Sequence, residues 1–170
     1  MNYIHIGKIV ASFGVKGEMI LTHKLGNKTA LKGVEAIFVE EVKGSYLPYF
    51  VTASKRKDTE EIFLTVEGVE TKEATRRLMQ KNVWLTEEDF EKVVDKAAPI
   101  GLIGFTVFNE GKHIGSVEEV IEQPHQVLLR ILYKTKDALI PIHSETLDKI
   151  DRKKKEVHVT LPDGLLELYE

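Results

Sequence analysis

The chain has 170 residues, no cysteine, 24 basic and 27 acidic side chains, and 42% hydrophobic residues. The lack of cysteine excludes disulfide scaffolds, thiolate metal sites and cysteine nucleophiles, and the ordinary hydrophobic content indicates a globular protein. A formal net charge of −3 argues against binding nucleic acid through phosphates over the whole surface, so only a local patch offers an electrostatic route to RNA.

No segment of the sequence has the properties of a membrane or secretion signal. The longest uncharged stretch, residues 97–109, is shorter than the roughly 20 apolar residues of a membrane helix, and it contains Pro99. The first residues lack the basic start, apolar core and small-residue cleavage site of a signal peptide. We therefore expect a soluble cytoplasmic protein.

The first half is predicted to consist mainly of strands, because runs rich in β-branched and aromatic residues alternate with turn-forming residues. The predicted strands cover residues 3–10, 18–23, 35–42, 47–56, 61–67 and 83–86. One helix interrupts them: Thr71 suits its N-cap, Glu73 suits its first turn, and Ala74 and Leu78 share one face.

Residues 86–101 form a boundary segment between the two halves of the chain. The second half is also predicted to form strands. These cover residues 104–109, 113–123, 126–133, 138–142 and 156–161. Five short strands at a spacing of about ten residues favour a small β-barrel, whose closure removes edge strands. We expect the polar segment 144–151 to form a turn that Ser144 caps ahead of Leu147 and Ile150.

The sequence contains no recognisable catalytic or cofactor-binding motif. Gly14 and Gly17 lie between two strands without the spacing of a P-loop or dinucleotide fingerprint, which predicts a hairpin loop. The histidines lack metal-ligand spacing, and His158, between two valines, is expected to face outward. No serine lies in a nucleophile-elbow motif. We expect no active site, no metal and no cofactor.

Two basic runs, residues 55–57 and 152–155, fall at predicted strand ends or turns. Solvated surface charge is the simple interpretation, and a local phosphate contact is the alternative. Beside the first run, Tyr46, Tyr49 and Phe50 either pack in the core or form a stacking platform for nucleic acid. We take core packing as the expectation.

Three separated stretches resemble the ribosome maturation factor RimM family. The first two are residues 6–18, with the Gly-x-x-Gly-Glu hairpin, and residues 66–74, followed by Leu78 and residues 83–85. The third is a series in the second half: Leu102-Ile103-Gly104, Gly115-Ser116-Val117, Val120, Glu122-Gln123-Pro124, Leu139-Ile140-Pro141-Ile142, Ile150-Asp151 and residues 161–166. The resemblance implies a mainly β protein with a six-stranded translation-factor-like barrel at residues 1–90, a linker at 91–101 and a PRC-type barrel at 102–170.

The resemblance also implies a function. The family consists of assembly factors without catalysis of their own, which bind the immature small ribosomal subunit through ribosomal protein nineteen and assist processing of the small-subunit rRNA. We expect a monomer with this role, and the net charge suits a basic ribosomal protein better than naked RNA. A general RNA-binding β-barrel is the alternative, and a flavin enzyme rests on fold analogy alone.

The resemblance places candidate binding residues in both halves. The expected protein-binding residues are Ala98, Pro99, Ile100, Leu102, Ile103, Gly104, Gln123 and Pro124. The expected contacts to rRNA or the ribosome are Phe13, Gly14, Lys16 and Gly17. The family often has a histidine at the position of Phe13, and an aromatic pair where this chain has Ala98 and Pro99. Buried aromatic anchors contribute about 2 kcal/mol or more each, so their loss predicts weaker or different docking.

Overall fold

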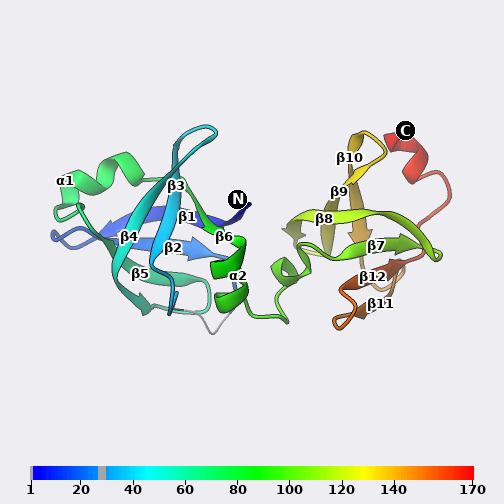
Figure 1. The fold of residues 1–170 in the computed structure, drawn as a ribbon, viewed down its shortest axis with the longest axis horizontal. Helices are drawn as coiled ribbons and strands as arrows, with labels where there is room; N and C mark the ends of the chain where they lie inside the picture. The colour runs from blue at the N-terminus through cyan, green and yellow to red at the C-terminus, as the bar shows by residue number, and fades with distance from the viewer. Residues whose placement is uncertain (1, 27–29) are drawn as a thin grey trace. The chain divides into compact units, whose positions relative to one another are not determined.

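The computed structural model describes residues 2–26 and 30–170 and divides into two compact units, Met1–Ala98 and Pro99–Glu170 (Figure 1). Each unit is built around six strands with a few short helices, which confirms the prediction of a mainly β protein.

The first unit is a closed six-stranded antiparallel barrel. Its strands are β1 (Tyr3–Phe13), β2 (Glu18–His23), β3 (Ala36–Val42), β4 (Ser45–Arg56), β5 (Glu61–Val66) and β6 (Asn82–Thr86). Around the barrel they follow the order β1-β2-β5-β4-β3-β6, and β6 pairs back onto β1. Closure therefore gives each strand two hydrogen-bonded neighbours and leaves no open sheet edge.

Alternate residues of these strands fill the barrel. In β2 and β5 every second side chain is buried, as the period of two along a strand requires. Ile9, Leu21, Ile37, Leu64 and Leu85 are all fully buried and form the centre of this core. Their opposite neighbours face outward, so the outer wall of the barrel presents the side chains that are available to a partner.

Two helical segments accompany the barrel strands. The helix α1 (Lys72–Thr75) begins after Thr71, whose hydroxyl accepts a hydrogen bond from the Ala74 N–H at 3.1 Å. This confirms the predicted N-cap, and the chain continues into the 3₁₀ helix η1 (Arg76–Leu78), where Leu78 is fully buried. The sequence analysis missed α2 (Glu87–Val93), which Thr86 caps by accepting from the Asp89 N–H at 3.2 Å. Its short length and single buried residue gave too little periodicity to predict it.

The second unit contains a six-stranded sheet. Its strands are β7 (Thr106–Asn109), β8 (Lys112–Gln123), β9 (Gln126–Tyr133), β10 (Lys136–Ile142), β11 (Leu147–Asp151) and β12 (Glu156–Val159). They follow the order β10-β9-β8-β7-β12-β11, and only the pairing of β7 with β12 is parallel in this sheet. Two 3₁₀ helices, η2 (Pro99–Leu102) and η3 (Leu166–Tyr169), lie at the ends of the unit's sequence.

Residues 144–146 form a turn as predicted, whereas the rest of the predicted turn segment forms the strand β11. Thr146 holds this turn, because its hydroxyl accepts from the His143 N–H at 3.2 Å and donates to the Pro141 carbonyl at 2.8 Å. Leu147 and Ile150 both pack against the core although they are three residues apart, because the register of β11 shifts between Leu147 and Lys149. The bulge therefore produced a spacing that resembled a helical turn.

None of the helices in the described part of the chain is both long and apolar enough to cross a membrane.

Candidate protein- and RNA-binding surfaces

The loop between β1 and β2 presents an apolar tip. Phe13 and Val15 are 51% and 73% exposed, and Gly14 and Lys16 are also exposed. The Phe13 ring contacts the Phe63 ring of β5 at a centroid distance of 4.9 Å. An exposed aromatic ring anchored from one side is suited to contact a partner surface.

Gly17 has a structural role in the same loop. It is buried, its φ is +90°, and a Cβ atom there would lie 2.2 Å from the Val69 carbonyl oxygen. The loop is further fixed by the Lys72 N–H, which donates to the Val15 carbonyl at 3.2 Å. Of the four predicted contact residues in this loop, Phe13, Gly14 and Lys16 are therefore accessible, and Gly17 positions them.

The predicted protein-binding segment at the start of the second unit is partly internal. Ile100 and Leu102 on η2 are buried, whereas Ala98, Pro99 and Ile103 are half-buried. The exposed Gly104 has a φ of +90°, and its N–H donates to the Val117 carbonyl of β8 at 2.9 Å. This segment therefore offers a narrow surface supported by buried aliphatic side chains.

The remaining two predicted residues lie elsewhere on the second unit. Gln123 and Pro124 are exposed at the tip of the β8–β9 hairpin, where Gln126 donates a side-chain hydrogen bond to Gln123 at 3.2 Å. Gln123 is six residues along β8 from Val117, which corresponds to about 20 Å of extended strand. The structure therefore separates the predicted protein-binding residues into two patches.

The outer wall of the barrel carries a cluster of rings that the sequence analysis did not identify. Tyr3 packs against Phe38 and Tyr46 at centroid distances of 4.7 and 5.1 Å, and Trp84 packs against His5 and Tyr46 at 5.0 and 4.9 Å. These five residues, on β1, β3, β4 and β6, are named here the outer ring cluster. They bring together residues from positions 3 to 84 of the chain.

This cluster corrects the expectation that Tyr46, Tyr49 and Phe50 pack in the core. No residue of β4 is buried. Tyr46 joins the outer ring cluster, Phe50 is 54% exposed, and the Tyr49 ring lies under the Arg77 guanidinium at 6.0 Å. The prediction failed because an aromatic residue on an outer barrel wall has the same sequence signal as one in the interior.

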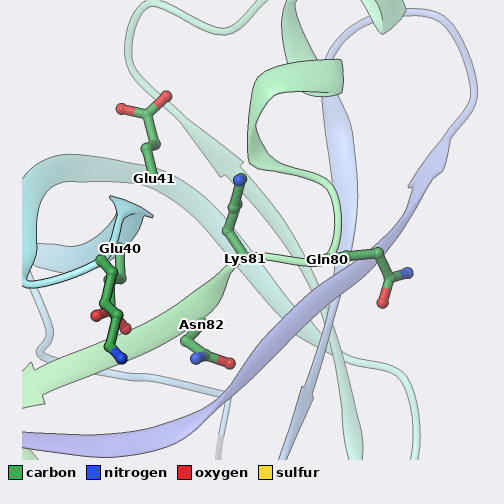
Figure 2. A pocket seen from close by; sticks show the side chains of 6 residues that line it. Glu40, Glu41, Gln80, Lys81 and Asn82 are labelled. Atoms are coloured by element: carbon green, nitrogen blue, oxygen red, sulfur yellow. The ribbon is translucent and has the colours of Figure 1, made fainter.

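A polar recess lies beside the outer ring cluster, and it has a volume of about 330 Å³. Figure 2 shows Glu40, Glu41, Gln80, Lys81 and Asn82 around it, and Lys43 completes the lining. The recess and the rings are joined through Glu40, whose carboxylate accepts a hydrogen bond from the Trp84 indole N–H at 3.3 Å.

Both carboxylates of the recess are engaged within the protein. Glu40 also accepts from the Gly44 N–H at 2.8 Å. The pKa of Glu40 lies below its ordinary value chiefly because of this backbone hydrogen bond; the side chains of Asn82 and Trp84 lower it further, and desolvation opposes the shift. Glu41 accepts from the Tyr49 hydroxyl at 3.0 Å and lies 3.6 Å from the Arg77 Nε.

The lysines at the recess are not engaged. Within residues 2–26 and 30–170, neither Lys43 nor Lys81 has an ion pair or a hydrogen bond from its ammonium group. Lys8 faces outward from β1, where it is the register partner of Asn82 on β6, and its ammonium is equally uncommitted in these ranges. The recess therefore offers cationic groups to a ligand, although both signs of charge line it.

The second unit has a locally acidic outer face on β8, β9 and β10. The Arg130 guanidinium lies 2.9 Å from Glu118, 3.8 Å from Glu119 and 3.4 Å from Asp137. Three carboxylates thus share one cation, because a register shift between Val117 and Glu119 brings two consecutive glutamates near the same side chain. This face therefore carries a local excess of negative charge.

The histidines do not form a metal site in the part of the chain that the structure describes, where no group of three potential ligands gathers. His158 alternates with buried Val157 and Val159 and stacks on Phe108 at a centroid distance of 5.1 Å, which confirms its predicted outward orientation. Its Nε2 lies 3.0 Å from a Glu156 carboxylate oxygen.

Comparison with known proteins identifies both units. Residues 4–90 match the RimM N-terminal domain, and residues 99–165 match the RimM PRC barrel domain. The chain belongs to the RimM family. This confirms the resemblance inferred from the three motif stretches, and it identifies the second unit as a PRC barrel domain.

Individual RimM relatives align along almost the whole chain. The ribosome maturation factor RimM of Christiangramia forsetii is 30% identical over 167 residues, which cover 97% of this chain and 95% of the relative. That of Parabacteroides distasonis is also 30% identical over 167 residues, covering 96% and 95% of the two chains. A solved 16S ribosomal RNA processing protein RimM from Pseudomonas aeruginosa covers 95% of this chain and 98% of its own, with 16% identity and a TM-score of 0.46.

Proposed function

We propose that this protein is a ribosome maturation factor that acts in the cytoplasm as a monomer, binds the immature small ribosomal subunit and assists processing of its rRNA, without catalysis of its own. Family membership carries this proposal, because both RimM domains match in order and relatives named ribosome maturation factor RimM align over nearly the full chain. The accessible surfaces described above are surfaces for binding, consistent with such a role.

Within the small subunit, we propose ribosomal protein nineteen as the partner of the second unit. The accessible predicted residues are Ala98 at the end of the first unit, Pro99, Ile103 and Gly104 on one patch of the second, and Gln123 and Pro124 on the other. Ile100 and Leu102 act indirectly, since their burial fixes the backbone of the first patch. Replacing the family's aromatic pair with Ala98 and Pro99 removes bulky anchors from the first patch, so more of the contact falls to the hairpin tip.

Electrostatics support a basic protein as this partner. The chain carries a net charge of −3, and the outer face of β8, β9 and β10 gathers Glu118, Glu119 and Asp137 around one arginine. Complementary charge accelerates association and disfavours wrong partners more than it raises affinity. An excess of carboxylates near the proposed patches therefore favours a cationic protein.

The proposal is tested by direct binding of the full-length protein to purified ribosomal protein nineteen. Gln123→Lys places a positive charge at the β8–β9 tip, and Thr135→Lys places the same charge at the exposed β9–β10 tip of the same unit. Because like charges at an interface cost several kcal/mol, we expect Gln123→Lys to weaken binding by about a hundredfold or more and Thr135→Lys to leave it unchanged. If the unmodified protein did not bind ribosomal protein nineteen while a RimM relative bound it in the same assay, the proposal of this partner would be refuted.

A further inference from the structure

The outer ring cluster and the recess beside it lie on one wall of the first unit, and Glu40 of the recess accepts the hydrogen bond of Trp84 in the cluster. The strand order places β4, β3, β6 and β1 next to one another, so rings from all four strands form one continuous surface. Asn82 lines the recess and Trp84 is the next outward residue of the same strand. Consecutive outward residues on a strand are about 7 Å apart.

We infer that this surface binds single-stranded RNA, with bases against the outer ring cluster and phosphates at Lys8, Lys43 and Lys81. This inference deepens the proposed function, on which it rests for the expectation that RNA is encountered. Surfaces that bind single strands combine aromatic side chains for the bases with cationic groups along the backbone, and both components are present here.

The rings of the cluster do not cover one another by parallel stacking. The four ring pairs of the cluster meet at interplanar angles of 51°, 37°, 40° and 63°, so none is a parallel stack. In the second unit, Phe108 and His158 instead stack at 12°, and each covers a face of the other. The indole N–H of Trp84 is already bonded to Glu40, which fixes its ring orientation without a ligand.

The charge of the recess favours RNA over a basic ribosomal protein. Its two carboxylates are held by internal partners: Gly44, Trp84 and Asn82 for Glu40, and Tyr49 and Arg77 for Glu41. The ammonium groups of Lys8, Lys43 and Lys81 have no such partners within the described residues. Because Arg77 balances Glu41, the three ammonium groups face one remaining carboxylate charge, that of Glu40. A cationic protein would meet this positive excess, whereas the phosphates of an RNA strand would neutralise it.

A single strand fits this surface better than a duplex. Bases in an RNA helix are stacked on one another, so their faces are not available to protein side chains, whereas unpaired bases can be splayed onto aromatic rings. The side-chain oxygens of Gln80 and Asn82 at the recess can accept hydrogen bonds from base N–H groups, including the ring N–H of uracil. Gln80 is held in place because its amide nitrogen donates to the Val10 carbonyl at 3.2 Å.

The chain provides its own reporter for the experiment. Its single tryptophan is Trp84, so tryptophan emission reports on the outer ring cluster alone. A short fluorescein-labelled oligouridylate is titrated with the full-length protein at several salt concentrations, and unlabelled oligouridylate is titrated while Trp84 emission is followed. We expect saturable binding and quenching of Trp84 with the same midpoint. No ribosomal protein is present, so this test and the test of the protein partner can fail independently.

Variants of the lysines test the phosphate contacts. Removing two phosphate contacts lowers the slope of log K against log salt by about 1.4 for a single strand, which corresponds to about 25-fold weaker binding near 0.1 M salt. We expect this for Lys43→Gln combined with Lys81→Gln. The matched control is Lys153→Gln with Lys154→Gln in the exposed β11–β12 turn, which changes the net charge equally and should leave binding nearly unchanged.

Removing one aromatic ring of the outer ring cluster tests whether RNA bases stack on it. Tyr46→Ala should weaken oligouridylate binding by about five- to 150-fold, the range for losing one base–aromatic stack, and thermal melting checks that the barrel remains folded. Three outcomes overturn the inference: binding that leaves Trp84 emission unchanged, an equal loss in the β11–β12 control, or no saturable binding. Loss of ribosomal protein nineteen binding in the Lys43/Lys81 variant, with RNA binding intact, would reassign the surface to a protein.

Discussion

Gly7 is a position where the barrel leaves no room for a side chain, and its replacement gives the sharpest stability prediction. It pairs with His23 across β1 and β2, beside a register shift between His5 and Gly7. A Cβ atom at Gly7 would lie 1.8 Å from the Thr22 carbonyl oxygen, 2.8 Å from its carbon and 2.9 Å from the His23 Cα. All three are backbone atoms, so no side-chain rotation relieves the clash.

The magnitude follows from the movement that Gly7→Ala requires. Restoring ordinary contact at about 3.4 Å separates the two backbones by roughly 1.6 Å at this point. That is enough to break the nearby hydrogen bond from the Lys24 N–H to the Ile6 carbonyl, now 3.1 Å. One lost hydrogen bond costs about 1 kcal/mol and overpacking costs about 1–3 kcal/mol, so we expect a loss of about 3 kcal/mol in unfolding free energy.

The assay is thermal unfolding followed by Trp84 emission, which reports on the first unit. For a unit of about 100 residues, a loss of about 3 kcal/mol lowers the unfolding midpoint by roughly 12–24 °C. Gly14→Ala is the control, because φ is +70° there and nothing lies within 4 Å of the added Cβ. Its cost is that of the left-handed backbone alone, about 1–2 kcal/mol. If Gly7→Ala destabilised the unit no more than Gly14→Ala, the close-approach argument would be refuted.

Two further predictions concern the buried residues His23 and Leu129. Burial lowers the pKa of His23 below its ordinary value of 6.5, against an opposing effect of Asp58, so the folded state binds fewer protons than the unfolded chain. The contribution of neutral His23 to the unfolding free energy should be fully present above pH 6.5 and should decrease below that pH by up to about 1.4 kcal/mol per pH unit. In urea titrations at several pH values, His23→Gln should reduce this dependence of the unfolding free energy on pH. The same dependence in both proteins would contradict the prediction. Leu129→Ala in β9 should lower the unfolding free energy of the second unit by about 2–5 kcal/mol, measured by hydrogen exchange of residues 99–170. The control is Leu132→Ala at a half-exposed position of the same strand, which should change the unfolding free energy by no more than about 0.5 kcal/mol. Equal effects of the two variants would show that Leu129 is not a core residue.

Much of the local structure was predictable because it depends on neighbouring residues. The Thr71 cap needs only a hydroxyl three residues before the Ala74 N–H, and the β1–β2 loop needs only glycines at Gly14 and Gly17. The strand runs were predictable from their β-branched and aromatic residues. The segments that were misassigned, α2 and β11, lack a regular period: α2 is short, and β11 is interrupted by a bulge.

The candidate sites were less predictable than the elements that carry them. The exposed loop at Phe13 and the hairpin tip at Gln123 are sequence-local, so the motif stretches located both. The outer ring cluster is not local, since Tyr3 meets Tyr46 and Trp84 only when the barrel closes β6 onto β1. No alternation of apolar and polar residues marks Phe38 and Trp84, because each stands between two aliphatic neighbours that face the core.

By itself, the sequence determined the strand content, the family and the absence of thiol chemistry, because these depend on composition, local propensity and the order of short motifs. Only the tertiary structure decided which face of each strand is buried and which residues from distant strands meet. It therefore placed Tyr46 outside the barrel and Ile100 and Leu102 inside their unit. It also held Glu40 and Glu41 with internal partners while leaving Lys43 and Lys81 available within the described residues. The physical reason is that burial and charge compensation depend on strand pairing across the closed barrel, which no local pattern records.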